Sequence, residues 1–240
     1  MEFSMRENWW QFLLIAIACY LVGGLSAARF FSRAKHEDIT KMGSGNPGTM
    51  NATRVYGWKA GCVVFLGDAV KAAVPVLVSH LCYRNYVFAG TNVVVSDVAR
   101  YYSAVFVALG HVFPIYQKFK GGKGIASTLG AFWVALSCES LWCILIGFGV
   151  AVVYVGFVCW TELGSLGSLC TVSGCTIGQA VVFALRYGVD PFNAYLVWVY
   201  AGLFALVLIT WCAHHKNLTR LLAGEEHHTS FRKFFKKRKK

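Results

Sequence analysis

Stretches of about twenty apolar residues recur along this chain and limit its possible folds more than any other feature. A helix of that length, rising 1.5 Å per residue, crosses about 30 Å of hydrocarbon. Only 14% of the residues are charged and 57% are apolar, whereas a soluble domain carries about a quarter charged residues. The sequence therefore predicts an all-α polytopic membrane protein with about seven transmembrane helices.

The expected spans are Trp10–Ala28, Ala60–Val78, Ser103–Tyr116, Ile125–Leu136, Leu141–Trp160, Cys170–Leu185 and Phe192–Cys212. The third and fourth are short, so a count of six is the alternative. The first run follows Arg6 and Glu7 and has no small-residue cleavage site behind it, so we interpret it as a span and not as a signal peptide.

The polar segments share one property: each follows an odd-numbered span. They are Ser32–Gly57, Gln117–Gly124, Thr161–Ser168 and His214 to the end, and most of the 23 Lys and Arg residues lie in or beside them. The positive-inside rule then places the amino terminus outside and the carboxyl terminus in the cytoplasm. We expect a single transmembrane domain over residues 1–213 and a cytoplasmic amphipathic segment with a basic tail over residues 214–240.

The tail Phe231–Lys240 supplies much of the net charge of +12. A juxtamembrane basic cluster is typical of binding to anionic lipid. The other interpretation is nucleic-acid binding, which we do not expect because nothing else in the chain resembles a nucleic-acid module. The predicted partner of the tail is membrane lipid.

The first polar segment contains a glycine-rich loop, Gly43–Arg54, that reads G-x-G-x-x-G through Gly43, Gly45 and Gly48. A dinucleotide site would need a βαβ unit around that motif, and here it lies between two membrane spans. Glycines still let successive N–H groups approach an anion. Neutral donors come from Ser44, Asn46, Thr49 and Asn51, and Arg54 adds a charge that can bind phosphate through two hydrogen bonds. We favour a phosphate site over a flexible linker.

A second candidate segment runs from His111 through Lys118 to Gly124. It is not a P-loop, because the first glycine of that motif is missing and no Ser or Thr follows Lys123. Gly121, Gly122 and Gly124 nevertheless surround Lys123 and would let the backbone deliver this lysine closely to a ligand. His111 precedes the helix-breaking Pro114 and is equally consistent with a hydrogen-bonded histidine inside the bundle.

Three further features are weaker when taken singly. Ser165 and Ser168 follow glycines at a spacing that also serves helix packing in membranes. His214 and Asn217 share one face of an expected interfacial helix. Asp68 and Lys71 stand three residues apart within a span, and we expect them to pair, in either a functional or a structural role.

Taken together and in order, these segments resemble the bacterial acyl-phosphate:glycerol-3-phosphate acyltransferases, the PlsY family. The resemblance rests on the Gly43–Arg54 loop, the Asp68 and Lys71 pair, the run from Gly110 to Gly124, the Ser165 and Ser168 loop, and the segment His214–Leu222. It covers nearly the whole chain. It implies seven spans, an external amino terminus, a cytoplasmic active site and a place in the bacterial inner membrane.

The resemblance also implies a reaction: a fatty acyl group moves from acyl phosphate to the 1-hydroxyl of glycerol 3-phosphate, giving lysophosphatidic acid and phosphate. The implied catalytic residues are Lys123, Arg54, His214, Asn217 and Ser165. The implied substrate-binding residues are Gly43, Ser44, Gly45, Asn46, Gly48, Thr49, Asn51, Gly121, Gly122 and Ser168. The general base is either His214 or a phosphate oxygen of the substrate.

Two positions depart from the family pattern. Met50 stands where the pattern has threonine, beside Thr49, and Ala213 stands where an arginine commonly precedes the histidine. Both departures bear on individual phosphate contacts and leave the expected reaction unchanged.

Residue patterns also weigh against other classes of protein. None of the seven histidines is followed five residues later by aspartate, as the soluble-type acyltransferase mechanism requires. Asp38, Asp68, Asp97 and Asp190 are scattered, which disfavours a metal-dependent phosphotransferase, and we expect no metal and no other cofactor. A small anion transporter is the remaining alternative, although the polar groups gather at one face and no internal repeat is visible.

Overall fold

The computed structural model describes residues 1–188, 190 and 192–226. The helices are α1 Met5–Gly23, α2 Ala27–Arg33, α3 Thr49–Tyr56, α4 Trp58–Tyr83, α5 Val95–Val112, α6 Ile125–Ser137, α7 Cys143–Thr161, α8 Gly164–Tyr187, α9 Ala194–Ala213 and α10 His215–Leu222. Short 3₁₀ turns cover Ile39–Lys41 and Ile115–Gln117. The basic tail Phe231–Lys240 lies outside the described residues.

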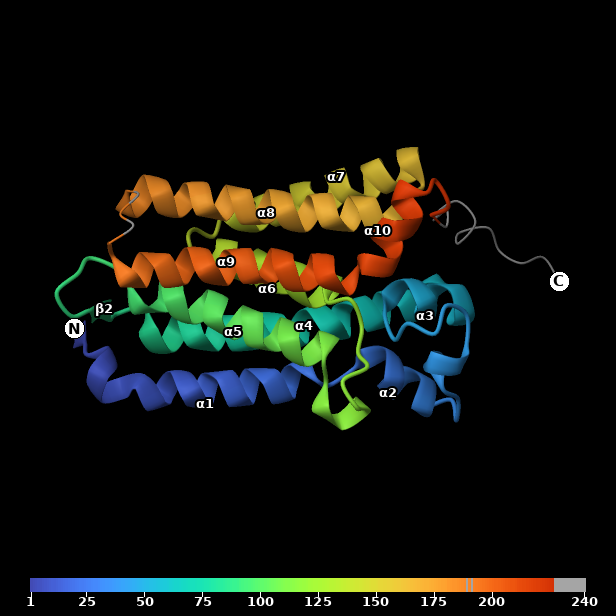
Figure 1. Ribbon diagram of the computed structural model, residues 1–240, viewed down its shortest axis with the longest axis horizontal. Coiled ribbons are helices and arrows are strands. Elements are labelled where there is room, and N and C mark those ends of the chain that lie inside the picture. Colours follow the sequence, from blue (N-terminus) through green and yellow to red (C-terminus); the bar gives the residue numbers. More distant parts are fainter. Residues whose placement is uncertain (189, 191, 227–240) are drawn as a thin grey trace.

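Seven of these helices, α1 and α4 to α9, run side by side along the long axis of the molecule (Figure 1). The short helices α2, α3 and α10 gather at one end, and the amino terminus lies at the other. Near the amino terminus the strands β1, Glu2–Phe3, and β2, Val87–Phe88, pair in parallel. This two-stranded ladder and an isolated bridge between Val87 and Val94 are the departures from an all-α fold within the described residues.

Six helical segments are long and apolar enough to cross a membrane. Of the seven helices in the bundle, α6 is too short to meet this criterion, because its 13 residues rise only about 20 Å. The helical membrane fold is confirmed, whereas the count of seven crossings stays a prediction.

Large apolar side chains point outward as well as inward. Trp160 and Leu185 are each 84% exposed, and α7 buries almost none of its length against the rest of the bundle. Such a surface is stable in lipid, which supplies the apolar contacts that a water-soluble protein must find inside. The bundle interior centres on α5, where Tyr101 and Val107 are buried.

The first predicted span, Trp10–Ala28, is two helices in the structure. Helix α1 ends at Gly23, and α2 begins after Ser26, whose hydroxyl accepts a hydrogen bond from Arg29 N. Before this break, α1 packs backbone to backbone on α5. A Cβ atom on Gly23 would lie 2.2 Å from Val107 O, and one on Gly110 would lie 2.0 Å from Tyr20 O, so both positions require glycine.

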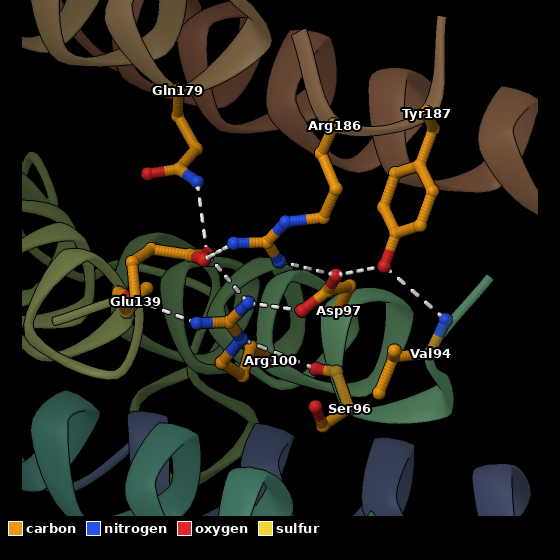
Figure 2. A network of polar contacts seen from close by, with 9 residues as sticks. Val94, Ser96, Asp97, Arg100, Glu139, Gln179, Arg186 and Tyr187 are labelled. Carbon is orange, nitrogen blue, oxygen red and sulfur yellow. Dashed lines mark hydrogen bonds and ion pairs between the residues drawn. The ribbon is translucent and has the colours of Figure 1, made fainter. Parts of the chain in front are cut away.

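The third span was predicted to begin at Ser103, but α5 begins eight residues earlier, at Val95. The prediction stopped short because Asp97 and Arg100 interrupt the apolar run. In the structure both side chains are buried in a network with Glu139 and Arg186 (Figure 2). Two carboxylates face two guanidinium groups, so the charges that led us to exclude this segment from the predicted span neutralise one another.

This ion network closes the end of the bundle nearest the amino terminus. Arg100 donates to Glu139 at 2.7 Å and also pairs with Asp97, and Arg186 donates to Asp97 at 2.9 Å and pairs with Glu139. Arg100 Nη1 further donates to the Ala135 carbonyl at 2.7 Å, near the end of α6. Through Ala135 and Glu139, these contacts join the C-terminal end of the short helix α6 to α5 and α8.

Candidate active site

A cavity of about 1270 Å³ runs from the end of the bundle that carries α3 and α10 into its apolar middle. Its polar end is lined by residues of the loop before α3, by α3 itself, by Lys123, by the first turns of α8 and by the α9–α10 junction. Its apolar arm lies among α6, α7 and α8. Lining residues of α7 and α8 such as Val153 and Gly174 are also exposed at the surface, so the cavity opens along this side. Its polar and apolar parts suit a ligand with a charged head and an apolar tail.

The glycine-rich loop is held in shape by Asn51, which is buried. The side-chain amide of Asn51 donates to the carbonyls of Met42 and Ile39 at 2.9 and 3.2 Å, and its Oδ1 accepts from Ser44 N at 2.8 Å. Gly43 and Gly45 have φ of +58° and +71°, which favours glycine. Asn51 was expected to contact phosphate, but its side chain makes these hydrogen bonds to the loop backbone instead. Gly43 and Gly45 do not line the cavity.

The second half of the predicted Gly43–Arg54 loop is helix α3. Its N-terminus faces the cavity through Gly48, Thr49 and Met50, alongside Ser44 and Asn46. The first N–H groups of a helix lack intrahelical partners and favour an anion. Thr49 lines the cavity, and its hydroxyl is buried with no hydrogen-bond partner among the described residues, so an unpaired donor is available beside this N-terminus.

Lys123 reaches across the cavity to α10, where its ammonium contacts Asn217 Oδ1. The expectation that Gly121 and Gly122 bring the backbone to a ligand is not supported. Their N–H groups donate to Val112 O and His111 O at 3.1 Å each, and a Cβ on Gly121 would lie 2.0 Å from His111 O. These glycines pack the loop against the end of α5 and thereby aim Lys123.

A carboxylate that the sequence analysis did not single out organises the opposite wall. Glu226 accepts hydrogen bonds from Asn217 Nδ2 at 2.6 Å, from Ser165 Oγ at 3.0 Å and from Arg220 Nε at 3.1 Å. Burial alone would raise the pKa of Glu226, but these hydrogen bonds and the Arg220 charge together hold it below its ordinary value. Glu226 therefore stays ionised and fixes the amide of Asn217 with Oδ1 toward Lys123.

The predicted loop Thr161–Ser168 is mostly helix, because α8 begins at Gly164. Ser165 and Ser168 lie on its first two turns, and both line the cavity. Ser168 Oγ donates to the Gly164 carbonyl at 2.8 Å. The two hydroxyls therefore stand at a helix N-terminus beside the cationic groups.

His214 is buried at the junction of α9 and α10. Its Nδ1 lies 2.8 Å from the Thr210 carbonyl, and because a carbonyl only accepts, Nδ1 carries the proton and Nε2 has a free lone pair. Burial lowers the pKa of His214 to about 4, and the nearby Lys123 charge acts in the same direction. The imidazole is neutral at pH 7.

The polar end carries three cationic side chains against the carboxylates of Glu226 and Asp68. Arg54, Lys123 and Arg220 all line it. Burial, together with the charges of Arg220 and Arg54, lowers the pKa of Lys123 to about 8 against the opposing effect of Glu226. An anion of two charges would relieve this repulsion, so the arrangement favours a dianionic ligand such as a phosphate monoester.

Asp68 and Lys71 pair at 2.9 Å, as expected. The pair also secures the break between α1 and α2, since Lys71 donates to the Leu25 carbonyl at 2.5 Å and Asp68 accepts from Ala27 N at 3.3 Å. Lys71 lies 2.7 Å from His111 Nδ1, and the ring of His111 packs on Gly122. This buried triad supports the loop that carries Lys123.

Of the expected site residues, Arg54, Lys123, Ser165, Ser168, His214, Asn217, Ser44, Asn46, Gly48, Thr49 and Asn51 line one cavity. Sequence reasoning missed Arg220 and Glu226 in this cavity. Their positions were the available signal. Arg220 lies three residues after Asn217, on the same helical face, and Glu226 lies four residues beyond Leu222, the last residue of α10.

Comparison with known proteins identifies the family of this chain. The model of the glycerol-3-phosphate acyltransferase family matches residues 13–224. A glycerol-3-phosphate acyltransferase of Syntrophotalea carbinolica is 35% identical over 90% of this chain and 96% of its own, and one of Pseudothermotoga lettingae is 31% identical over 95% and 99%.

Solved structures share the fold. The crystal structure of PlsY (YgiH), an integral membrane glycerol 3-phosphate acyltransferase, in its glycerol 3-phosphate form aligns with a TM-score of 0.74 at 24% identity, over 93% of this chain and 98% of that one. The lysophosphatidic acid form aligns with a TM-score of 0.71 at 25% identity, over 91% and 95%. The chain belongs to the glycerol-3-phosphate acyltransferase family.

Proposed function

We propose that this protein transfers a fatty acyl group from acyl phosphate to the 1-hydroxyl of glycerol 3-phosphate, giving lysophosphatidic acid and phosphate. The observation that carries the proposal is the single cavity in which a cationic, donor-rich end continues into an apolar arm. An acyl phosphate has this same division into a charged head and an apolar tail. A transporter of small anions would have no use for the apolar arm.

The acyl-phosphate head is assigned to the N-terminus of α3. Ser44, Asn46 and Thr49 surround the free N–H groups of this helix, and these groups stabilise the charge that develops as phosphate leaves. Because acyl phosphate is a mixed anhydride with a good leaving group, positioning and charge stabilisation are the main tasks of the enzyme.

Glycerol 3-phosphate is assigned to the opposite wall. Its dianion would lie among Lys123, Arg54 and Arg220, with Ser165 and Asn217 as neutral partners. This placement leaves the 1-hydroxyl near His214 Nε2. In the reaction the hydroxyl oxygen attacks the acyl carbon, the bond from that carbon to the phosphate oxygen breaks, and the hydroxyl proton leaves.

Two acceptors for that proton are available, His214 and a phosphate oxygen of the substrate. A pKa of about 4 makes His214 a weak base in the empty site, although a bound dianion would raise it. We assign His214 the role of accepting the hydroxyl hydrogen bond and orienting the attack, and we assign the proton to phosphate.

We further infer a bacterial inner-membrane protein that crosses the bilayer seven times, with the amino terminus outside. Residues 1–213 would form the membrane domain and residues 214–240 a cytoplasmic segment. Charge supports this orientation, because the loops at the active-site end carry most of the Lys and Arg residues. The highly polar acceptor would then enter from the cytoplasm.

The test is incubation of the purified protein with palmitoyl phosphate and radiolabelled glycerol 3-phosphate. Labelled lysophosphatidic acid is expected with acyl phosphate, and none is expected with acyl-CoA or acyl carrier protein as the donor. Chelators are expected to leave the rate unchanged. Turnover with acyl-CoA as the only donor would overturn the proposal, as would uptake of labelled phosphate into proteoliposomes without any acyl transfer.

A further inference from the structure

The apolar arm of the cavity follows α8. Residues of this helix that line it recur every three or four positions from Ser165 through Ser168, Thr171 and Gly174 to Gly178, which is the spacing of one helical face. The facing walls come from α6 and α7 and carry bulky side chains such as Phe132, Trp133 and Leu136. The arm is therefore a groove whose depth is measured along α8.

Two glycines on α8 leave space in the groove because they carry no side chain. Gly174 and Gly178 both line the cavity, and a Cβ atom built on either would meet no other atom within 4 Å. They differ in this from Gly23 and Gly110, which the packing of α1 against α5 requires. Glycine within a helix is less stable than alanine by about 1 kcal/mol, and no packing contact requires it at these two positions. Because both also line the cavity, we infer that they leave space in the groove.

Near its far end, one turn before Val182, the groove becomes polar. Gln179 lines the cavity, is 1% exposed, and donates to Glu139 Oε1 at 3.3 Å. Glu139 in turn belongs to the network with Arg100 and Arg186 (Figure 2). A hydrocarbon chain gains burial along the groove but meets hydrogen-bonded and ionised groups at this floor, where an apolar group cannot replace the lost partners.

We propose that Gly174, Gly178 and the polar floor at Gln179 set the length of acyl chain that this enzyme accepts. The inference rests on the proposed acyl transfer and adds the residues that select among its donors. The occupant of the groove is the acyl chain of the donor, because the groove opens into the site that binds the phosphate head.

The structure gives the length that is selected. Ser165 marks the polar end, and the 14 residues from it to Gln179 rise about 21 Å along α8. A zigzag chain with C–C bonds of about 1.5 Å advances roughly 1.3 Å per carbon, so the groove accepts about sixteen carbons. The same arithmetic places Gly174 at about ten carbons and Gly178 at about fifteen.

The experiment measures kcat/KM for acyl phosphates of eight to twenty carbons in mixed micelles of constant composition, for the wild type and for three variants. Gly174→Leu and Gly178→Leu fill the groove at different depths. Gly156→Leu is the matched control: this glycine also lies on a spanning helix and has open space around its Cβ position, but it does not line the cavity. Each rate is expressed relative to wild type with the same donor.

Each buried methylene contributes about fourfold to affinity. Gly174→Leu is therefore expected to lower kcat/KM for the sixteen-carbon donor by at least about tenfold and to leave donors of eight to ten carbons unchanged. Gly178→Leu should lower kcat/KM only for donors of sixteen carbons and longer. Gly156→Leu should leave kcat/KM unchanged at every chain length. In the wild type, kcat/KM should rise to about sixteen carbons and then stop rising.

An equal loss at all chain lengths in Gly174→Leu, or an unchanged profile in both cavity variants, would overturn the inference while acyl transfer by the wild type still stood. Complete inactivity of the wild type with every acyl phosphate would instead refute the proposed function. Circular dichroism and the retention volume in detergent confirm that each variant is folded before it is scored.

Discussion

Replacement of Lys123 by alanine tests the site most directly. The ammonium lies in the cationic end of the cavity and contacts Asn217 Oδ1. Its removal deletes a charge-assisted contact to the glycerol 3-phosphate dianion, worth about 1.5–3 kcal/mol. At 1.36 kcal/mol per decade, kcat/KM for glycerol 3-phosphate should fall by about ten- to a hundredfold. The loss of a partner for Asn217 makes the upper part of this range the expectation.

Lys118 and Lys120 supply the matched controls, since both lie on the same loop, are exposed, and do not line the cavity. Lys118→Ala and Lys120→Ala should stay close to wild type, because an exposed charge contributes about 0–1 kcal/mol. Steady-state assays in detergent compare kcat/KM of the three variants with the wild type, and thermal unfolding confirms that each variant is folded. Equal losses at the three lysines would indicate a diffuse electrostatic attraction, and full activity of folded Lys123→Ala would remove this residue from the site.

The pH profile provides a second measurement of the same group. The pKa of Lys123 is lowered to about 8, so the charged form predominates below that pH and is lost as the pH rises through it. The kcat/KM of the wild type, which reports the free enzyme, should therefore fall above about pH 8. Lys123→Arg keeps its charge throughout this range, and whatever activity it retains should lack that alkaline decline.

Three further predictions concern the scaffold and its orientation. Glu139→Gln removes a carboxylate from buried Arg100 and should destabilise the fold by about 3–5 kcal/mol, measured as a lower unfolding temperature in detergent; an unchanged temperature would contradict the network's structural role. Lys71→Met leaves Asp68 buried without its cation, and stability should return in the double variant with Asp68→Leu; a double variant no better than the single would count against the pairing. In a cysteine-free background, a cysteine in place of the exposed Lys41, near Gly45, should be labelled only from the cytoplasm and one in place of Asn92 only from outside; external labelling at position 41 would reverse the inferred topology.

Sequence reasoning succeeded where a feature depends on residues close together in the chain. Apolar runs locate the spanning helices. The glycine-rich segment around Lys123 and the order of motifs that resembles the family indicate residues that the structure places in one cavity, although their roles stay predictions. It failed where a residue's role depends on partners distant in the chain. Arg100 interrupts an apolar run and is nevertheless buried, because Glu139 neutralises it from 39 positions away.

The same limit applies inside the site. The composition around Lys123 indicates glycines that approach a ligand, yet Gly121 and Gly122 use their N–H groups to hold the end of α5. Only the three-dimensional arrangement shows that two carbonyls already occupy those donors. Glu226 was missed for a related reason, since its neighbours Ser165 and Asn217 lie 61 and 9 residues away and no single segment contains the whole constellation.

The side opening of the cavity determines how the reaction rate depends on the surroundings of the enzyme. Because residues that line the apolar arm on α7 and α8, such as Val153 and Gly174, are also exposed at the surface, a donor dissolved in the bilayer can enter by lateral diffusion without passing through water. The concentration that governs saturation is then the mole fraction of donor in the surrounding lipid or detergent. Adding inert detergent at constant total donor should slow the enzyme by surface dilution, whereas diluting the whole sample in buffer should affect only saturation with the water-soluble acceptor.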